Sequence, residues 1–413
     1  MTELVKRERE LQPDNKRAAS SAARSVLRSC SRFCCFLGSI IVIFALLGTL
    51  LELASWAIWS MYPLTRQAEL ENQIASPVYA GAEWAKEFWQ EESARRKKHS
   101  IYVPFRLWSV TSWHGKYINN DPGSGGYLRR TINPANCEAP RKITVWTFGG
   151  STMYGTAVPD WATIPSYLSR DLNSGGNDCV VVSNFGVEGY VTDQELILLE
   201  EQLKAAGKPD IVIFYDGVND SSLAWPPSNS PMPHFQYGTI KNRIEGSLSG
   251  RLDFLQKSYA LRLVREWMSR LHRPSSFTQL ISQAQPNVIA ALNNYEGNMR
   301  LARAFADAYK FKLYCFWQPM LVYGHKPFVP FEQQMAIRDA SGASFDSAWF
   351  LTNVAVYREA ELHAARDVNY VFLGDLFDST KEPVYVDEAH LGPRGNEIAA
   401  QAIASYIRNH PEK

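Results

Sequence analysis

The chain has 413 residues, 46% of them hydrophobic, and its 43 Lys and Arg balance 42 Asp and Glu to a formal net charge of +1. A chain of this length can bury a large core in one large or two modest domains, and its composition excludes disorder throughout. The charge balance argues against a polyanion binder, so nucleic acid is not an expected partner.

The N-terminal part of the chain divides into a basic tail and an apolar segment. Residues 1–32 are rich in Lys and Arg, and residues 33–51 carry no charge and are long enough to cross a bilayer as a helix. Aromatic residues follow at its far end, where a membrane interface is expected: Trp56, Trp59 and Tyr62. We therefore predict a basic cytoplasmic tail at 1–32 and a single transmembrane helix at 33–62. A cleaved signal peptide and a buried apolar helix are the alternatives.

The positive charges before the apolar segment predict that residues beyond it lie outside the cytoplasm, in a periplasm or at the cell exterior. Three cysteines fall in that part of the chain, namely Cys137, Cys179 and Cys315. Cys137 and Cys179 each precede a predicted strand, and the sequence leaves open whether they form a disulfide. Cys315 lies within an apolar strand and is expected in the core.

Residues 63–140 connect the membrane segment to the rest of the chain. Residues 63–100 contain clustered charges and predict a polar helix or stalk, while residues 101–140 are rich in turn formers and predict an irregular lead-in.

From residue 141 to 413 apolar strands alternate with helices. We expect strands at 143–148, 180–184, 211–215, 312–317 and 369–373, and helices at 164–172, 192–207, 287–309, 346–366 and 394–408. Residues 221–286 interrupt this rhythm with a proline-rich stretch and an amphipathic helix around 252–271, which indicates an insertion over one rim of the sheet. Continuous apolar strands separated by helices favour a parallel sheet covered on both faces. Chemistry then collects in the loops that follow the strands.

Three such loops contain glycines and polar side chains. In Gly149-Gly150-Ser151-Thr152 a serine stands at a strand-to-helix turn, where its hydroxyl could act as a nucleophile. A second loop ends at Gly189, and a third contains Asn219. The amides of Ser151 and Gly189 and the side chain of Asn219 could together surround developing negative charge. Each loop alone is explained more simply as turn chemistry.

A fourth loop, before the last helix, contains Asp387 and His390. A carboxylate three residues before a histidine can bond one ring nitrogen, which fixes the tautomer and leaves the other nitrogen free to act as a base. For this loop alone, a role in helix entry without catalysis is the alternative.

These four segments, in this order on this strand pattern, resemble the SGNH branch of the GDSL-type hydrolases. The resemblance covers residues 141–409 apart from the insertion, and one departure is that Gly150 replaces the aspartate of the name-giving Gly-Asp-Ser. The matching blocks are Gly149-Gly150-Ser151-Thr152, Asn184-x-Gly186-x-x-Gly189, Gly217-x-Asn219-Asp220, and Asp387-x-x-His390 with Gly395-Asn396.

The resemblance implies a flavodoxin-like three-layer α/β/α fold with a central parallel sheet, and acyl transfer from an ester through a covalent acyl-serine. It implies Ser151 as nucleophile, His390 as general base and acid, and Asp387 as the residue that orients His390. The amides of Ser151, Gly189 and Asn219 would form the oxyanion hole. No cofactor is expected, and the sequence contains no His and Cys spacing typical of a zinc site.

The motifs do not identify the acyl group or its acceptor. Tyr154, Trp161 and Gln318 lie on or near loops after strands and are candidate substrate-binding residues. The topology favours a membrane-anchored esterase that removes O-acyl (acetyl) groups from an extracytoplasmic glycan, with a glycan O-acyltransferase or a lipid esterase as alternatives. A non-catalytic glycan-binding or assembly subunit is the alternative of another class. The sequence does not predict the oligomeric state.

Overall fold

The structure is a computed structural model, and it divides the chain into two compact units, residues 1–65 with 252–268 and residues 66–251 with 269–413. The residues that it describes are 35–36, 38–58, 60, 70–98, 100–123, 126–136, 141–174, 178–205, 207–225, 232–246, 258–264, 277–340, 345–366 and 370–411.

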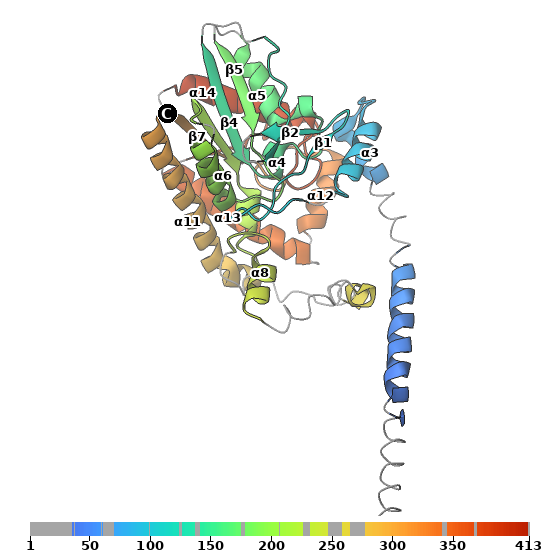
Figure 1. The fold of residues 1–413 in the computed structure, drawn as a ribbon. Helices are drawn as coiled ribbons and strands as arrows, with labels where there is room; N and C mark the ends of the chain where they lie inside the picture. The colour runs from blue at the N-terminus through green and yellow to red at the C-terminus, as the bar shows by residue number, and fades with distance from the viewer. Residues whose placement is uncertain are drawn as a thin grey trace, which may run out of the picture. The chain divides into compact units, whose positions relative to one another are not determined.

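The first unit contains a helix over Gly38–Ile58, with a mean hydropathy of 2.1, which is long and apolar enough to cross a membrane (Figure 1). Its large apolar side chains are exposed within the unit. Glu52 on this helix accepts hydrogen bonds from the Ser258 hydroxyl at 2.8 Å and the Tyr259 amide at 2.6 Å. Of the amphipathic helix expected around 252–271, only residues 258–264 are described.

The second unit is built on a sheet of eight strands in the order β1-β2-β3-β5-β4-β6-β7-β8. The five strands β4 to β8 are parallel, and the pairings of β1 with β2, β2 with β3 and β3 with β5 are antiparallel. Numbered along the chain, the parallel strands follow the order 2-1-3-4-5, which is the flavodoxin-like arrangement. Their bounds are β1 Trp113–His114, β2 Asn119–Gly123, β3 Gly126–Arg129, β4 Lys142–Gly149, β5 Cys179–Asn184, β6 Ile211–Asp216, β7 Lys312–Trp317 and β8 Val371–Phe372.

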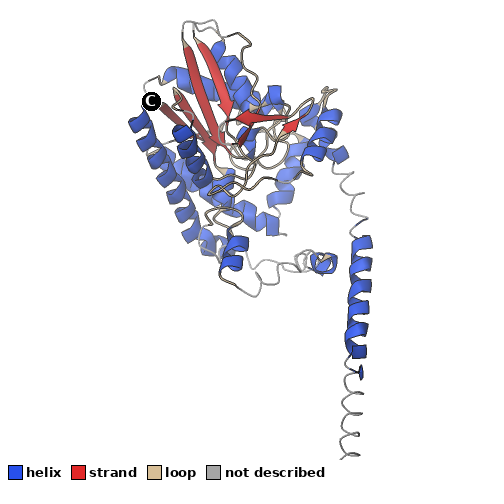
Figure 2. Ribbon diagram, viewed as in Figure 1, coloured by secondary structure: helices blue, strands red, loops and turns tan. Residues whose placement is uncertain are grey.

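Helices cover both faces of this sheet (Figures 1 and 2). Alternate residues of each strand point to opposite faces, so Phe214 packs in one core cluster and Ile213 in the other. Helices α6 (Thr192–Ala205), α11 (Phe277–Tyr309) and α13 (Phe345–Ala364) contribute to the first cluster, and α5 (Ile164–Asn173) and α14 (Pro393–Asn409) to the second. The expected three-layer α/β/α fold with a central parallel sheet is confirmed.

The remaining elements lie in the loops and at the rim. They are η1 (Pro77–Tyr79), α3 (Ala85–Arg95), α4 (Ser151–Tyr154), η2 (Asp160–Ala162), α7 (Val218–Ser222), α8 (Tyr237–Ile244) and α12 (Pro330–Ala340). The helix expected from residue 287 begins ten residues earlier, at Phe277, and contains Pro286 in its interior. Proline usually marks the first turn of a helix, and this placed the predicted boundary too late.

The segment expected as a polar stalk and irregular lead-in contributes to the second unit. Phe88 and Trp89 of α3 are buried in a small core with Tyr79 and Tyr117, and strands β1 to β3 extend the sheet. The charges that predicted a solvated helix are partly internal, because Glu92 is 2% exposed and pairs with arginines of the same helix. Helix α3 therefore does not form the expected polar stalk with solvated charges.

The two cysteines expected in the globular unit and described by the structure differ in state. Cys179, the first residue of β5, is disulfide-bonded, and Cys137 lies outside the described residues. Cys315 is a free thiol in the core, as expected, and burial raises its pKa to about 12.

Candidate active site

The candidate site lies at the carboxyl ends of β4 and β6, where the strand order reverses. Ser151 begins α4 directly after β4, and Asn219 lies in α7 directly after β6. Loops that leave a parallel sheet in opposite directions at such a point open a crevice between them. The loop before α14 brings Asp387 and His390 to the same place. The four sequence blocks therefore meet in one site, as the resemblance implies.

Ser151, His390 and Asp387 form a continuous hydrogen-bonded chain. The distance between Ser151 Oγ and His390 Nε2 is 2.7 Å, and the distance between His390 Nδ1 and Asp387 Oδ2 is also 2.7 Å. The second carboxylate oxygen of Asp387 accepts the backbone N–H groups of Ala389 at 3.0 Å and His390 at 2.7 Å. The carboxylate is thus held on both oxygens, and it orients the imidazole toward the serine.

The charges in this hydrogen-bonded chain keep Asp387 ionised and favour the protonated form of His390. Burial alone would raise the pKa of Asp387, but the charge and hydrogen bonds of His390 keep that pKa well below its usual range. Burial likewise disfavours the imidazolium, yet the Asp387 carboxylate outweighs it and raises the pKa of His390 above 6.5. A base of this kind can take the Ser151 proton and hold it as a stabilised imidazolium.

A small cavity of about 140 Å³ opens beside Ser151 Oγ. Three of the predicted site residues besides Ser151 line it: Asn219, Gln318 and His390. Three lining residues lie outside the motif blocks and were not predicted: Ser222, Phe235 and Trp349. Phe235 comes from the expected insertion and Trp349 from α13. No local pattern marks Phe235 or Trp349, because only the packing of distant segments brings them to Ser151.

Asn219 is held beside Ser151 at the cavity. Its side-chain nitrogen donates to the Tyr190 carbonyl at 2.8 Å, and the same NH₂ group carries a second hydrogen. Gly150 packs against it, since a Cβ at that position would lie 2.4 Å from Asn219 Nδ2. The departure from Gly-Asp-Ser therefore has a steric reason in this chain.

Gly189 directly precedes Tyr190, whose carbonyl accepts the Asn219 side chain. Its φ of +77° is in the left-handed region that favours glycine, and a Cβ there would be 4.0 Å from the ring of Phe235, which lines the cavity. The structure thus brings the loop of Gly189 near Ser151 and Asn219. A role for its amide as an oxyanion donor stays a prediction.

Asn184 joins the first two loops, a role that the sequence did not assign. Its side chain donates to the Met153 carbonyl at 3.0 Å and accepts the Gly186 amide at 2.9 Å. Gly186 can approach α4 this closely only without a side chain, because a Cβ would lie 2.4 Å from the Tyr154 amide nitrogen. Asn184 therefore fixes the turn that presents Ser151.

The three candidate substrate-binding residues have different surroundings. Gln318 lines the cavity, and its Oε1 accepts the Thr152 hydroxyl at 2.9 Å. Tyr154 is fully buried, and its hydroxyl donates to Asn120 at 3.0 Å, so its ring is enclosed by core and cannot contact a ligand. Trp161 is 45% exposed but lines a separate pocket with Tyr167. The expectation for Tyr154 and Trp161 is therefore wrong for the cavity at Ser151.

A chain of ion pairs connects α3 to the loop of Gly189. Glu92 accepts Arg95 Nε at 2.7 Å and Arg96 Nε at 2.6 Å, and Arg95 Nη2 also binds Glu188 Oε1 at 2.9 Å. Burial would raise the pKa of Glu92, but the two arginines lower it, so the carboxylate stays ionised. Because Glu188 directly precedes Gly189, α3 helps to hold this loop in place.

No model of a known protein family and no curated protein matches the sequence significantly. Solved structures similar to this one include a lipolytic G-D-S-L family member from Veillonella parvula DSM 2008, with 13% identity, 64% of this chain and 98% of that chain covered, and a TM-score of 0.32. Others are the acetylxylan esterase Axe2 from Geobacillus stearothermophilus, with 13% identity, 65% and 94% covered and a TM-score of 0.31, and the lipase/acylhydrolase from Enterococcus faecalis, with 17% identity, 65% and 96% covered and a TM-score of 0.31. At these values the likeness carries no argument about activity, which depends on the geometry of the chain itself.

Proposed function

We propose that this protein is a membrane-anchored serine esterase that removes small O-acyl groups, such as acetyl, from an extracytoplasmic glycan through an acyl-serine intermediate. The observation that carries the proposal is the hydrogen-bonded chain from Ser151 through His390 to Asp387 at the edge of a small cavity.

In the first half of the proposed reaction, His390 Nε2 takes the proton of the Ser151 hydroxyl as Oγ attacks the ester carbonyl carbon. The carbonyl oxygen becomes an oxyanion, which the second N–H of the Asn219 amide can bind. His390 then gives its proton to the leaving alcohol oxygen as the C–O bond breaks. The products are a free hydroxyl on the glycan and an acyl group on Ser151.

In the second half, His390 takes a proton from water as the water oxygen attacks the acyl-serine carbonyl. Collapse of this second tetrahedral species breaks the bond to Ser151 Oγ, which regains a proton from His390, and a carboxylic acid leaves. Asp387 stays ionised throughout and stabilises the imidazolium.

The size of the cavity favours a short acyl group. Its volume of about 140 Å³ is well below the 300–1,000 Å³ typical of pockets for larger ligands. An acetyl group needs little more room than its carbonyl and one methyl group. A long lipid acyl chain would need a longer apolar channel, so the cavity supports a short-chain ester such as an acetyl ester over a long-chain lipid ester.

The proposed location of the activity rests on the apolar helix and the charges that precede it. We propose that Gly38–Ile58 anchors the protein and that the basic tail remains cytoplasmic, which places the catalytic unit outside. A topology reporter fused at residue 20 should then be read as cytoplasmic and one at the C-terminus as external. The reverse pattern would overturn the proposed location.

The decisive test of the chemistry is labelling of the full-length protein in detergent with a fluorophosphonate serine probe. Labelling of the wild type should disappear in Ser151→Ala and persist in Ser174→Ala, which removes a surface hydroxyl on the same unit. Hydrolysis of 4-nitrophenyl acetate by Ser151→Ala should fall by about 10⁴-fold or more. A folded wild type that is not labelled would reject the esterase and favour a non-catalytic glycan-binding subunit.

A further inference from the structure

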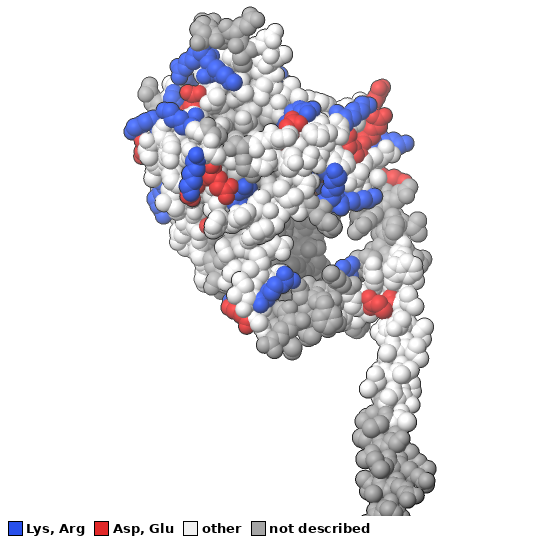
Figure 3. All heavy atoms as spheres, in the orientation of Figure 1, with Lys and Arg blue, Asp and Glu red and all other residues white. Residues whose placement is uncertain are grey.

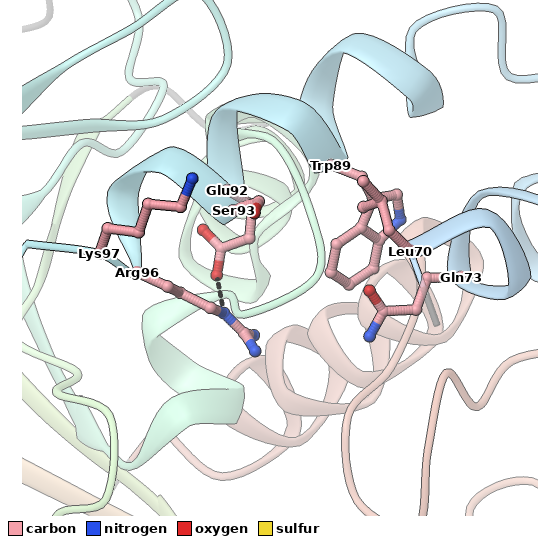
Figure 4. Close-up of a pocket in the computed structure, with 7 residues that line it drawn as sticks. All are labelled: Leu70, Gln73, Trp89, Glu92, Ser93, Arg96 and Lys97. Carbon is pink, nitrogen blue, oxygen red and sulfur yellow. Dashed lines mark hydrogen bonds and ion pairs between the residues drawn. The ribbon is translucent and has the colours of Figure 1, made fainter. Parts of the chain in front are cut away.

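A second pocket lies on α3, apart from the cavity at Ser151, and the proposed reaction does not use it (Figure 4). It has a volume of about 370 Å³, within the range of ligand pockets. Its walls include Gln73, Trp89, Arg96 and Lys97. In Figure 3, basic and acidic side chains gather over α3, where the sequence contains the run Arg95-Arg96-Lys97-Lys98.

The guanidinium of Arg96 is held in position for a ligand. The buried Glu92 carboxylate accepts Arg96 Nε at 2.6 Å, and the terminal amino groups of Arg96 make no hydrogen bond within the described part of the chain. Figure 4 shows the tip of Arg96 and the carboxamide of Gln73 facing the space between them. An arginine fixed through Nε loses less conformational freedom when its remaining donors bind a carboxylate.

The charge of the pocket is positive. Lys97 lies at the rim and forms no ion pair with any residue that the structure describes, so Arg96 and Lys97 face a single lining carboxylate, Glu92. The Glu92 carboxylate also forms an ion pair with Arg95. An anion entering the pocket would therefore find two cations, and Glu92 would repel it only weakly.

The other walls suit a sugar ring. Gln73 and the hydroxyl of Ser93 provide hydrogen-bonding groups for neighbouring hydroxyls, and the edge of the Trp89 indole, which is 3% exposed, closes one side. An anionic lipid surface is attracted instead by four or more free cations. The basic run does not supply these, because Arg95 is buried in ion pairs with Glu92 and Glu188.

The pocket also shares its packing with the loop that holds the catalytic histidine. Trp89 packs edge-on against Tyr79, with ring centroids 6.0 Å apart. The neighbouring Val78 packs against Gly392, since a Cβ there would lie 1.9 Å from Val78 Cγ1, and Val386, just before Asp387, packs in the same cluster. A polymeric substrate that occupies the pocket would therefore pass close to the Asp387–His390 loop.

We propose that the α3 pocket binds the carboxylate of a sugar acid, so that the substrate of Ser151 is an acetylated acidic glycan. The identification of this substrate rests on the proposed esterase function, whereas the binding of the acidic sugar does not.

The test is a calorimetric titration of full-length Ser151→Ala in neutral detergent with hexagalacturonate and, as a neutral comparison, maltohexaose. Hexagalacturonate should bind more tightly, and rising salt should weaken it selectively. Adding Arg96→Gln or Lys97→Glu should weaken hexagalacturonate binding by roughly threefold to tenfold. Lys86→Glu, the same change at an exposed α3 position outside the pocket, should leave binding unchanged.

Equal affinity for the two oligosaccharides, or equal effects of Lys97→Glu and Lys86→Glu, would overturn the proposal. So would binding to vesicles of phosphatidylglycerol and phosphatidylcholine that Lys97→Glu weakens and Lys86→Glu does not, without binding to hexagalacturonate, because the ligand of the pocket would then be a lipid surface. Since Ser151→Ala is inactive by design, failure of the esterase is seen separately, as absence of fluorophosphonate labelling in the wild type.

Discussion

The carboxyl groups at the mouth of the site and those buried beneath it have pKa values shifted in opposite directions. At the mouth of the site, Asp387 is bound by His390 and two backbone amides, and its pKa lies well below the usual range. Beneath the site, Glu195, Asp216 and Asp220 are all buried near one another, and each has a raised pKa. The same functional group is stabilised as an anion in one place and shifted toward the neutral acid in the other.

Burial alone does not explain this difference. Glu92 is as deeply buried as the members of the trio, yet two arginines lower its pKa. The main influences on the pKa of Glu195 are burial and the neighbouring Asp216, both of which raise it. The lesson is that the partners of a buried carboxyl group decide whether it serves as a charge or as a neutral part of the core.

The largest expected effect separates the two regions by matched Asp→Asn changes. Asp387→Asn should lower kcat by about 10³- to 10⁴-fold, because the imidazole loses the anion that fixes its tautomer and stabilises its charge. Asp216→Asn, which mimics a carboxyl group that is already neutral, should change kcat only a few-fold.

The pH profile sharpens the same comparison. In the wild type, kcat/KM should rise with pH through an apparent pKa above 6.5, because His390 must lose its proton to act as a base. In Asp216→Asn this limb should stay in place. If Asp387→Asn and Asp216→Asn impair hydrolysis equally, the assignment of Asp387 as the orienting residue is wrong.

A smaller effect is expected at Asn219, between the two regions. Asn219→Ala should lower kcat by about 10²-fold through loss of an oxyanion donor, with KM little changed. Steady-state kinetics with 4-nitrophenyl acetate measures this split. An unchanged kcat with a raised KM would make Asn219 a substrate contact instead.

The smallest effect concerns stability and the buried trio. Burial raises the pKa of Asp220 to about 7, although the Thr192 hydroxyl and amide oppose this. The pKa of Asp220 in the folded state exceeds the unfolded value of about 3.9. Its contribution to the free energy of unfolding is therefore fully present below about pH 3.9 and is lost as the pH rises to about 7. Between pH 5 and pH 8 the folded state should lose about 1–3 kcal/mol.

Thermal unfolding of Asp220→Asn tests this expectation. The variant keeps an acceptor for Thr192 but cannot ionise, so its Tm should change less between pH 5 and pH 8 than that of the wild type. An equal pH dependence in both proteins would show that Asp220 is not the group responsible.

Much of the site could be predicted from the sequence because its residues stand at fixed places on regular elements. Ser151, Asn219 and His390 each follow or precede an apolar element whose type is evident from composition, and a parallel sheet brings such ends together. The residues that sequence reasoning missed, such as Phe235 and Trp349, belong to segments with no local motif. Tyr154 was misplaced because its neighbourhood in sequence suggested the pocket, whereas α4 turns its ring into the core.

The sequence by itself determined the apolar N-terminal helix, the alternation of strands and helices and the order of the four loops, since these depend on local pattern and period. Only the tertiary structure decided that α3 is part of the catalytic unit, that its charges are paired inside the protein, and that a second pocket lies beside the His390 loop. These features depend on contacts such as Arg95 with Glu188, which are 93 residues apart. Whether a charged residue faces water or a buried partner is set by packing between distant segments, which no local pattern records.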